Sequence, residues 1–187
     1  SFYKNSCITI TGTNGKSTTC QILYEALLNQ KFNVRLAGNI GSPILSIKNF
    51  NRKTLFVIEA SSYQLEYSKI FKSKYAAILN ISPDHIERHK TLNQYTKAKF
   101  KLLKSQSKGG LAFVKKNDKF INQELKSCKL KGKVIKVNIK NKKNFFKKIK
   151  NRYFLNETNR ENLSFVYEIS KKLNLNKKLL LDSIEKF

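Results

Sequence analysis

The sequence predicts an α/β domain in which a mostly parallel β-sheet carries helices on both faces. Short β-branched and apolar runs alternate along the chain with segments whose apolar residues recur at helical spacing, which is typical of repeated β–α–β units. The first apolar run ends in a Gly-rich turn that opens into a helical pattern, the context of a phosphate-binding loop (P-loop). Polar residues follow the later runs, where parallel strands present their carboxyl ends.

The phosphate loop follows the first apolar run. Gly12 and Gly15 allow the backbone to approach an anion closely, so that successive N–H groups can point into the turn. Lys16 supplies a mobile cation for the outer phosphate oxygens, and the hydroxyl of Ser17 is placed to bind Mg²⁺. Ile10 stands where the general pattern has its first Gly. The alternative is a strand–turn–helix corner with a surface lysine, but the context favours an ATP-binding loop.

The remaining elements are predicted from periodicity and turn residues. Strands are expected over residues 5–11, 33–37, 55–58, 75–81, 111–114, 134–137 and 153–155. Helices are expected over about residues 16–30, 91–105, 162–173 and 176–186. No internal repeat or flexible linker interrupts this pattern, so we expect a single domain over residues 1–187.

Candidate functional side chains stand directly after several predicted strands. Asn39 follows the second strand, Glu59 ends the third, and His85 lies shortly after the fourth. In an open parallel sheet, ligands bind beyond the carboxyl ends of the strands. These residues and the phosphate loop are therefore expected to share one site, in which Glu59 could hold Mg²⁺.

Lys99 differs from its neighbours by its place on the helix predicted over residues 91–105. On a wheel of 100° per residue it lies within an apolar stripe, whereas Lys97, Lys101 and Lys104 point the other way. Lys99 could face the body of the domain as a functional amine. It could equally be a snorkelling lysine whose ammonium reaches the domain edge. The pattern leaves these two interpretations level.

His85 and His89 are four residues apart, a spacing that could suggest zinc. No clear third ligand accompanies them, which argues against a zinc site. The three cysteines also lack metal-ligand spacing and fit a reduced cytosolic compartment.

The formal net charge of +26 would suit a nucleic-acid-binding protein. However, 18 of the 38 basic residues are spread along residues 101–152, and only one of those 18 is an arginine. Scattered lysines indicate solvated surface, since arginine is the more common reader of bases and phosphates. The sequence contains no run of eighteen apolar residues and no signal-peptide pattern. We therefore expect no nucleic-acid or membrane partner, and the absence of Met suggests a piece of a longer protein.

Several segments together resemble the Mur ligases of peptidoglycan synthesis, and specifically their central ATP-binding domain, over nearly the whole chain. They are residues 12–19 (GTNGKSTT), 38–41 (GNIG), 59–66 (EASSYQLE), 80–89 (NISPDHIERH) and 95–99 (YTKAK). The second and third look most like the D-glutamate-adding members of the family. Sister Mur ligases and folylpolyglutamate synthase carry a different segment after the strand-end glutamate.

The resemblance implies a cytoplasmic bacterial ligase that uses ATP and two Mg²⁺ sites to join D-glutamate to UDP-N-acetylmuramoyl-L-alanine through an acyl phosphate. Flanking domains of the same chain would complete it. The implied catalytic residues are Lys16, His85 and Lys99. The implied metal ligands are Ser17, Glu59, His85 and Lys99 as a carbamate. The implied nucleotide-binding residues are Gly12, Thr13, Asn14, Gly15, Lys16, Ser17, Thr18, Asn159 and Asn162. The implied substrate-binding residues are Asn39, Ser61 and Gln64.

One segment departs from the family pattern, which usually reads Gly-x-His-Asn-x-x-Asn. Asn156 and Thr158 replace its Gly and His, whereas Asn159 and Asn162 are kept. The departure bears on the local loop geometry and on the nucleotide contact. The other hypotheses are another Mur ligase, folylpolyglutamate synthase, a non-catalytic nucleotide-binding domain and a basic nucleic-acid-binding module.

Overall fold

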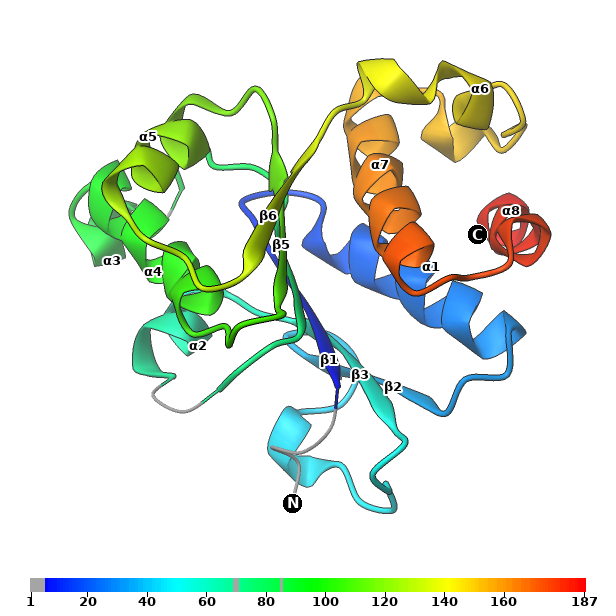
Figure 1. Ribbon diagram of the computed structural model, residues 1–187, viewed down its shortest axis with the longest axis horizontal. Coiled ribbons are helices and arrows are strands. Elements are labelled where there is room, and N and C mark those ends of the chain that lie inside the picture. Colours follow the sequence, from blue (N-terminus) through cyan, green and yellow to red (C-terminus); the bar gives the residue numbers. More distant parts are fainter. Residues whose placement is uncertain (1–5, 69–70, 85) are drawn as a thin grey trace.

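The computed structural model describes residues 6–68, 71–84 and 86–187, and its centre is a six-stranded sheet in which every pair of neighbours is parallel (Figure 1). The strands are β1 (Cys7–Thr11), β2 (Val34–Gly38), β3 (Leu55–Glu59), β4 (Tyr75–Ile78), β5 (Leu111–Lys115) and β6 (Lys133–Val137). Their order across the sheet is β2-β3-β1-β4-β5-β6. The predicted α/β class and six of the seven predicted strands are confirmed.

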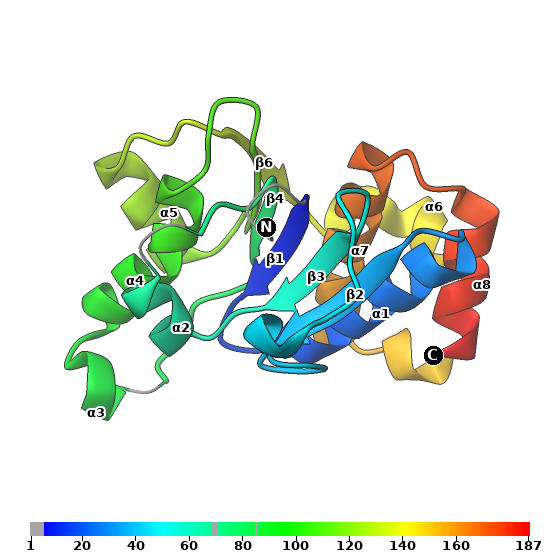
Figure 2. The ribbon, with the colours of Figure 1, turned by 90° about the horizontal axis from the view of Figure 1, so that it is seen from below.

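Helices cover both faces of this sheet, as Figure 2 shows in a view from below. One face carries α1 (Lys16–Asn29), α6 (Lys143–Phe146), α7 (Glu157–Lys172) and α8 (Lys177–Lys186). The other face carries α2 (Ser62–Tyr67), α3 (Ile86–His89), α4 (Leu92–Lys104) and α5 (Lys119–Ser127). Short 3₁₀ turns are η2 (Ile44–Ser46), η3 (Lys140–Lys142) and η4 (Arg152–Phe154). Within the described residues, no helix is both long and apolar enough to cross a membrane.

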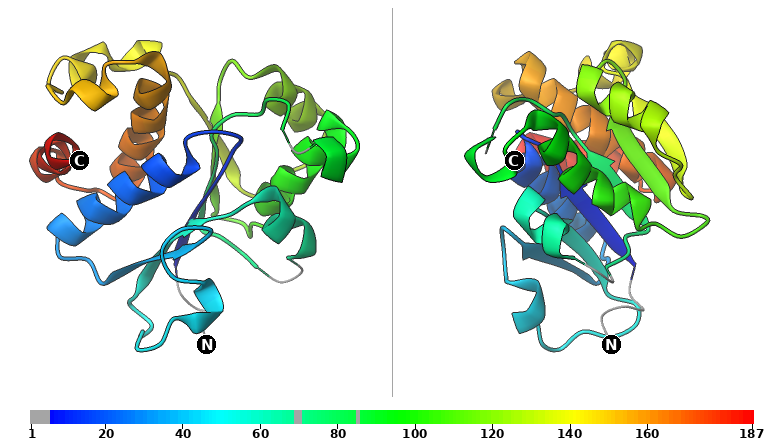
Figure 3. Two further views of the ribbon diagram at one scale, coloured as in Figure 1. Left: turned by 180° about the vertical axis from the view of Figure 1, so that it is seen from behind. Right: turned by 90° about the vertical axis from the view of Figure 1, so that its left-hand side faces the viewer.

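Two large apolar cores hold the layers together. The helices that cover them lie on opposite sides of the sheet (Figure 3). Successive strand residues point to opposite faces, and both faces are covered, so the inner strands β1, β3 and β4 are buried along their whole length. Ile8 and Ile10 of β1 belong to the core beneath α1, α7 and α8. Ala76 and Ile78 of β4 belong to the core beneath α2, α4 and α5. The carboxyl ends of the strands are therefore left as the edge where polar loops meet.

The prediction of a strand over residues 153–155 is wrong. This segment is the 3₁₀ turn η4, because the Asn151 side chain accepts a hydrogen bond from the backbone N–H of Tyr153 (3.0 Å) and turns the chain. The strand predicted over residues 75–81 is also shorter, since β4 ends at Ile78. Beyond that point the backbone of Asn80 bonds to the phosphate loop instead of extending the ladder.

The helix predicted over residues 162–173 begins five residues earlier, at Glu157. Asn156 causes this start, because its side-chain oxygen accepts from the backbone N–H of Asn159 (2.8 Å) and caps α7. The capping role also gives Asn156 a structural reason for standing where the family pattern has Gly.

Candidate active site at the carboxyl edge of the sheet

The phosphate loop connects β1 to α1, where the sequence predicts it. Gly15 forms the N-cap of α1 with φ +81° and ψ 1°, a left-handed conformation that favours glycine. A Cβ at this position would lie 2.1 Å from the side-chain oxygen of Asn162 on α7. The Lys16 ammonium folds back and donates to the carbonyl of Thr13 (2.7 Å). The loop is thus formed and braced from α7, with its lysine on the loop itself.

Asn80, which follows β4, holds the other side of the phosphate loop. Its side-chain oxygen accepts from the backbone N–H groups of Thr13 (3.1 Å) and Asn14 (2.9 Å), and its amide donates to the Asn14 carbonyl (3.1 Å). No role for Asn80 is predicted from the sequence, because the strand expected over residues 75–81 includes it. In the structure β4 ends at Ile78, which frees Asn80 to contact the loop.

Glu59 receives hydrogen bonds from both predicted neighbours. The Ser17 hydroxyl donates to one carboxylate oxygen (2.8 Å), and the Asn39 amide donates to the other (3.0 Å). Glu59 is buried at 2% exposure at the end of β3, next to β1 and β2 in the sheet. Gly38 makes this approach possible, because its φ is +106° and a Cβ there would lie 2.1 Å from the Glu59 carbonyl oxygen. The predicted convergence at the carboxyl edge is confirmed for these side chains.

The donor set at this point fits Mg²⁺. A serine hydroxyl and a carboxylate are hard oxygen ligands, and Mg²⁺ is commonly held by one or two such groups while water and substrate phosphates complete the shell. Ser17 and Glu59 are already within hydrogen-bonding distance of each other, so both can turn to one ion. Within the described part of the chain, no group of three or more His, Cys, Asp and Glu side chains could hold a metal by itself.

Lys99 faces the body of the domain, as the helical wheel allowed. Its side chain is 1% exposed, whereas Lys97 on the same helix is exposed. Its Nζ donates to the carbonyl of Gly12 (2.9 Å) and lies 3.4 Å from the Thr11 hydroxyl. The ammonium also lies 4.4 Å from the ring centre of Tyr95. The amine therefore reaches the phosphate loop from the face opposite α1, and the snorkelling interpretation is wrong.

Burial, and to a smaller extent the nearby charge of Lys16, lowers the pKa of Lys99 from 10.5 to about 7, while Asp84 opposes the shift. Desolvation dominates because the amine is cut off from water on an apolar face. The carbonyl of Gly12 can accept a hydrogen bond from either protonation state of the amine, so it does not require the ammonium form. Lys99 is thus partly neutral near pH 7, which makes its nitrogen lone pair available.

The second histidine of the predicted pair is buried. The His89 Nε2 lies 2.9 Å from the Ser62 hydroxyl, and its ring packs between Tyr63 (5.6 Å between ring centres) and Tyr95 (5.3 Å). His85 lies outside the described residues. His89 therefore connects the first turn of α2 to the helix that carries Lys99.

Ser61 and Gln64, the predicted substrate-binding residues, form a capping box at the start of α2. The Ser61 hydroxyl accepts from the backbone N–H of Gln64 (3.2 Å), and the Gln64 side-chain oxygen accepts from the backbone N–H of Ser61 (2.9 Å). This reciprocal pattern fixes the turn after Glu59. The serine–x–x–glutamine spacing was visible in the sequence and could have predicted the helix.

Asn159, Asn162 and Thr18 meet beside the phosphate loop. Asn162 is 2% exposed and packs against Gly15. The Asn159 amide donates to the carbonyl of Tyr153 (2.7 Å), and the Tyr153 hydroxyl lies 3.3 Å from the Thr18 hydroxyl. These contacts fasten the start of α7 and the η4 turn to the first turn of α1.

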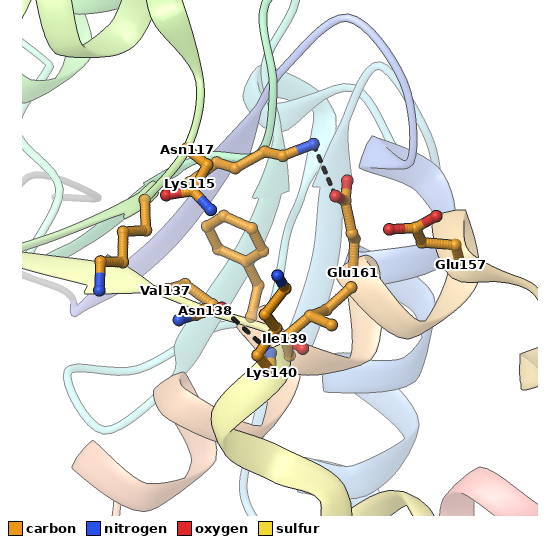
Figure 4. A pocket seen from close by; sticks show the side chains of 11 residues that line it. Lys115, Asn117, Val137, Asn138, Ile139, Lys140, Glu157 and Glu161 are labelled. Atoms are coloured by element: carbon orange, nitrogen blue, oxygen red, sulfur yellow. Dashed lines mark hydrogen bonds and ion pairs between the residues drawn. The ribbon is translucent and has the colours of Figure 1, made fainter.

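A cavity of about 270 Å³ opens beyond the carboxyl ends of β5 and β6, next to the first turns of α7 (Figure 4). Lys115 and Glu161 face each other there and form an ion pair (2.6 Å). Glu161 lies on α7, the helix whose Asn162 packs against Gly15 of the phosphate loop.

The parallel sheet, the phosphate loop and the Ser17–Glu59 pair define a P-loop α/β domain. The family model "Mur ligase middle domain" matches residues 10–180, so the chain belongs to the Mur ligase family. The family resemblance expected from the sequence is therefore confirmed.

Curated relatives carry one shared name, UDP-N-acetylmuramoylalanine–D-glutamate ligase. The protein from Caldicellulosiruptor bescii is 48% identical over 99 residues, which is 52% of this chain and 22% of the relative. The protein from Elusimicrobium minutum is 41% identical over 140 residues, which is 70% of this chain and 31% of the relative. The chain thus spans less than a third of these relatives.

The fold matches solved Mur ligase structures. The MurF ligase from Thermotoga maritima, in complex with ADP, aligns with a TM-score of 0.73 at 18% identity, covering 96% of this chain and 48% of that one. A murein peptide ligase from Neisseria meningitides, named UDP-N-acetylmuramate:L-alanyl-gamma-D-glutamyl-meso-diaminopimelate ligase, aligns with a TM-score of 0.74 at 15% identity, covering 98% and 66%. At these identities the likeness establishes the fold.

Proposed function

We propose that this chain is the ATP-binding part of a cytoplasmic bacterial ligase that joins D-glutamate to UDP-N-acetylmuramoyl-L-alanine. The observation that carries the proposal is the Ser17–Glu59 hydrogen bond beside a formed phosphate loop (2.8 Å). The names of the curated relatives support the choice of amino acid. The flanking parts of such a protein would supply most contacts to the UDP group and to D-glutamate.

In this proposal, ATP binds with its phosphates on the loop formed by Gly12, Thr13, Asn14 and Gly15, and Ser17 and Thr18 contact it from the first turn of α1. Backbone N–H groups and the helix dipole then face the phosphates. Asn159 and Asn162, in the first turns of α7, would contact the nucleotide beside the loop, where Asn162 packs against Gly15. Ser17 and Glu59 would hold Mg²⁺, which neutralises phosphate charge when bound.

The first chemical step is phosphoryl transfer. A carboxylate oxygen of UDP-N-acetylmuramoyl-L-alanine attacks the γ-phosphorus, the bond to the bridging oxygen breaks, and ADP leaves. Charge collects on the phosphoryl oxygens, so positioning and electrostatics provide most of the catalysis. Lys16 swings from the Thr13 carbonyl to the transferred group and neutralises it. The amine of D-glutamate then attacks the acyl carbon, releasing phosphate and leaving an amide after loss of a proton.

Lys99 and His85 are assigned to a second metal site. The neutral amine of Lys99 can take up CO₂, forming an N–C bond and releasing a proton, which gives a carbamate with a negative charge. Its lowered pKa favours the neutral amine that this reaction needs. Asn39, Ser61 and Gln64 would line the substrate side, where Asn39 also orients Glu59.

The test is turnover of the full-length protein with ATP, UDP-N-acetylmuramoyl-L-alanine and D-glutamate. We expect product with D-glutamate, and background rates when L-alanine replaces it or when a folate is the acceptor. A matching rate with either alternative would overturn the assigned substrate. Lys16→Ala should abolish turnover while leaving the circular dichroism spectrum unchanged, and near-normal turnover would remove the phosphate-loop assignment.

Lys99→Ala should also inactivate the full-length enzyme, with partial recovery on addition of acetate, which can occupy the place of the carbamate. Lys97→Ala is the matched control because its side chain is exposed on the same helix. Equal, mild losses in both variants would exclude a catalytic role for Lys99.

A further inference from the structure

A second basic hollow lies between η3, α6, α7 and the start of α8. It has a volume of about 230 Å³. Its lining consists of Lys140, Lys142, Lys143, Asn144, Phe145, Tyr167 and Lys177. Among the described residues that line it, Lys140 is the one that also borders the cavity beyond β5 and β6. The proposed ligase reaction gives this hollow no task.

One of its lysines, Lys142, is buried in the wall of the hollow and paired with a carboxylate. Lys142 is 6% exposed, and its ammonium donates to the carbonyl of Asn138 (2.8 Å) and pairs with Glu168 on α7 (3.0 Å). Its charge is therefore compensated within the protein. The remaining charges belong to Lys140, Lys143 and Lys177, whose side chains are exposed.

Lys140, Lys143 and Lys177 line this hollow, and its described lining includes no carboxylate. Like charges that converge on a concave surface raise the positive potential inside it, because the protein wall focuses the field. The rings of Phe145 and Tyr167 pack against each other (4.5 Å between centres) and provide an apolar part of that wall. The arrangement favours an anion inside the hollow.

The start of α8 adds to this potential. Its first turn contains Lys177 and Lys178, and no acidic residue stands in that turn. The N-terminus of a helix carries a partial positive charge that acidic groups or anions normally offset. Asn176 caps two backbone N–H groups but brings no charge. No acidic residue of this first turn offsets its positive charge.

Size limits the ligand. A volume of about 230 Å³ is below the roughly 300–1,000 Å³ typical of sites for drug-sized molecules. It corresponds to about seven water molecules at roughly 30 Å³ each. A compact anion fits this space, whereas a whole nucleotide would protrude from it.

We propose that this hollow is a second anion site, which binds a compact group carrying two phosphoryl units through Lys140, Lys143 and Lys177. Three ammonium groups match the charge of such a group. The proposal does not depend on the ligase function, since it involves none of the residues of the phosphate loop.

The test measures pyrophosphate binding by calorimetry at low salt in the full-length protein with Lys16→Ala, which weakens the phosphate loop. We expect one remaining site, and Lys143→Gln with Lys177→Gln should raise its Kd at least tenfold. The matched control is Lys119→Gln with Lys126→Gln on α5, which removes the same charge from exposed lysines on the opposite face of the sheet. The control should change Kd less than twofold.

Two results would overturn the proposal. One is that Lys16→Ala removes all pyrophosphate binding. The other is that both double variants weaken binding equally, which would mean that only the overall charge attracts the anion. Sedimentation with vesicles containing a polyphosphoinositide distinguishes the source of the group. If the protein sediments with the vesicles and Lys143→Gln/Lys177→Gln does not, the ligand is a lipid headgroup. If the protein binds pyrophosphate but does not sediment with the vesicles, the ligand is a free anion.

Discussion

Replacement of Lys99 by methionine should change how stability depends on pH, because this buried amine gives up its proton on folding near neutral pH. The folded-state pKa is lowered from 10.5 to about 7. Below pH 7 both states hold the proton, and the folded state bears the full cost of a buried charge. Between pH 7 and pH 10.5 the unfolded chain still holds the proton and the folded chain does not. Unfolding then takes up a proton, so the free energy of unfolding rises with pH.

The expected size follows from these two pKa values. Each pH unit with a full difference of one proton contributes about 1.4 kcal/mol to the free energy of unfolding. Since the folded state is half-titrated near pH 7, the rise between pH 7 and pH 9 is about 2 kcal/mol. Above pH 10.5 both states are neutral and the contribution is constant. Lys99→Met abolishes this rise, because methionine keeps the unbranched chain without a titrating group.

The assay is urea unfolding of wild type and Lys99→Met from pH 6 to pH 9, in buffers freed of CO₂ so that the amine stays unmodified. The quantity of interest is the difference between the free energies of unfolding of wild type and Lys99→Met. In this difference the titration of the thiols and of the other groups that both proteins share cancels. Lys97→Met is the control and should give a difference independent of pH. A wild-type minus Lys99→Met difference that stays flat, or that falls as pH rises, would refute the reasoning.

Three further expectations follow from local geometry. Gly15→Ala should lower the free energy of unfolding and weaken ATP binding more than Gly109→Ala. Both positions have positive φ, but only the Cβ added at Gly15 would meet another residue, at 2.1 Å from Asn162. Equal losses of stability in urea unfolding and of affinity in calorimetry would contradict this. Asn156→Ala should cost about 1 kcal/mol in urea unfolding by removing the cap of α7, and an unchanged midpoint would reject it. The 187-residue chain alone should form no ligase product, and measurable product would exclude the need for flanking parts.

Much of the site could be predicted because parallel strands present their carboxyl ends at one edge. Asn39 and Glu59 needed only that rule to be placed beside the phosphate loop, and both are found there. Helical periodicity put Lys99 on the apolar stripe of its helix but left open whether its amine was buried, which the structure shows at 1% exposure. These inferences depend on local repeats of the chain, which the sequence displays directly.

Hydrogen-bond partners far apart in the sequence could not be predicted in the same way. Asn80 holds the phosphate loop 66 residues away, and Tyr153 reaches Thr18 across 135 residues. Such partners depend on how loops approach each other after the sheet has formed. The η4 turn shows that a local pattern can also mislead, because its short aromatic run predicted a strand. In the structure the side chain of Asn151 accepts from the backbone N–H of Tyr153, and the segment forms a turn.

The two lysines at the phosphate loop, Lys16 and Lys99, have identical side chains in different environments. Lys16 donates to the carbonyl of Thr13, and Lys99 donates to the adjacent carbonyl of Gly12 from the buried side. The charge of Lys16 disfavours the ammonium form of Lys99, but desolvation of Lys99 is the larger cause of its lowered pKa. Lys99 is the more buried amine and its pKa falls, partly because of the charge on Lys16. Neighbouring carbonyls of one loop therefore accept from a half-buried lysine of α1 and from a buried lysine of α4 whose pKa is lowered.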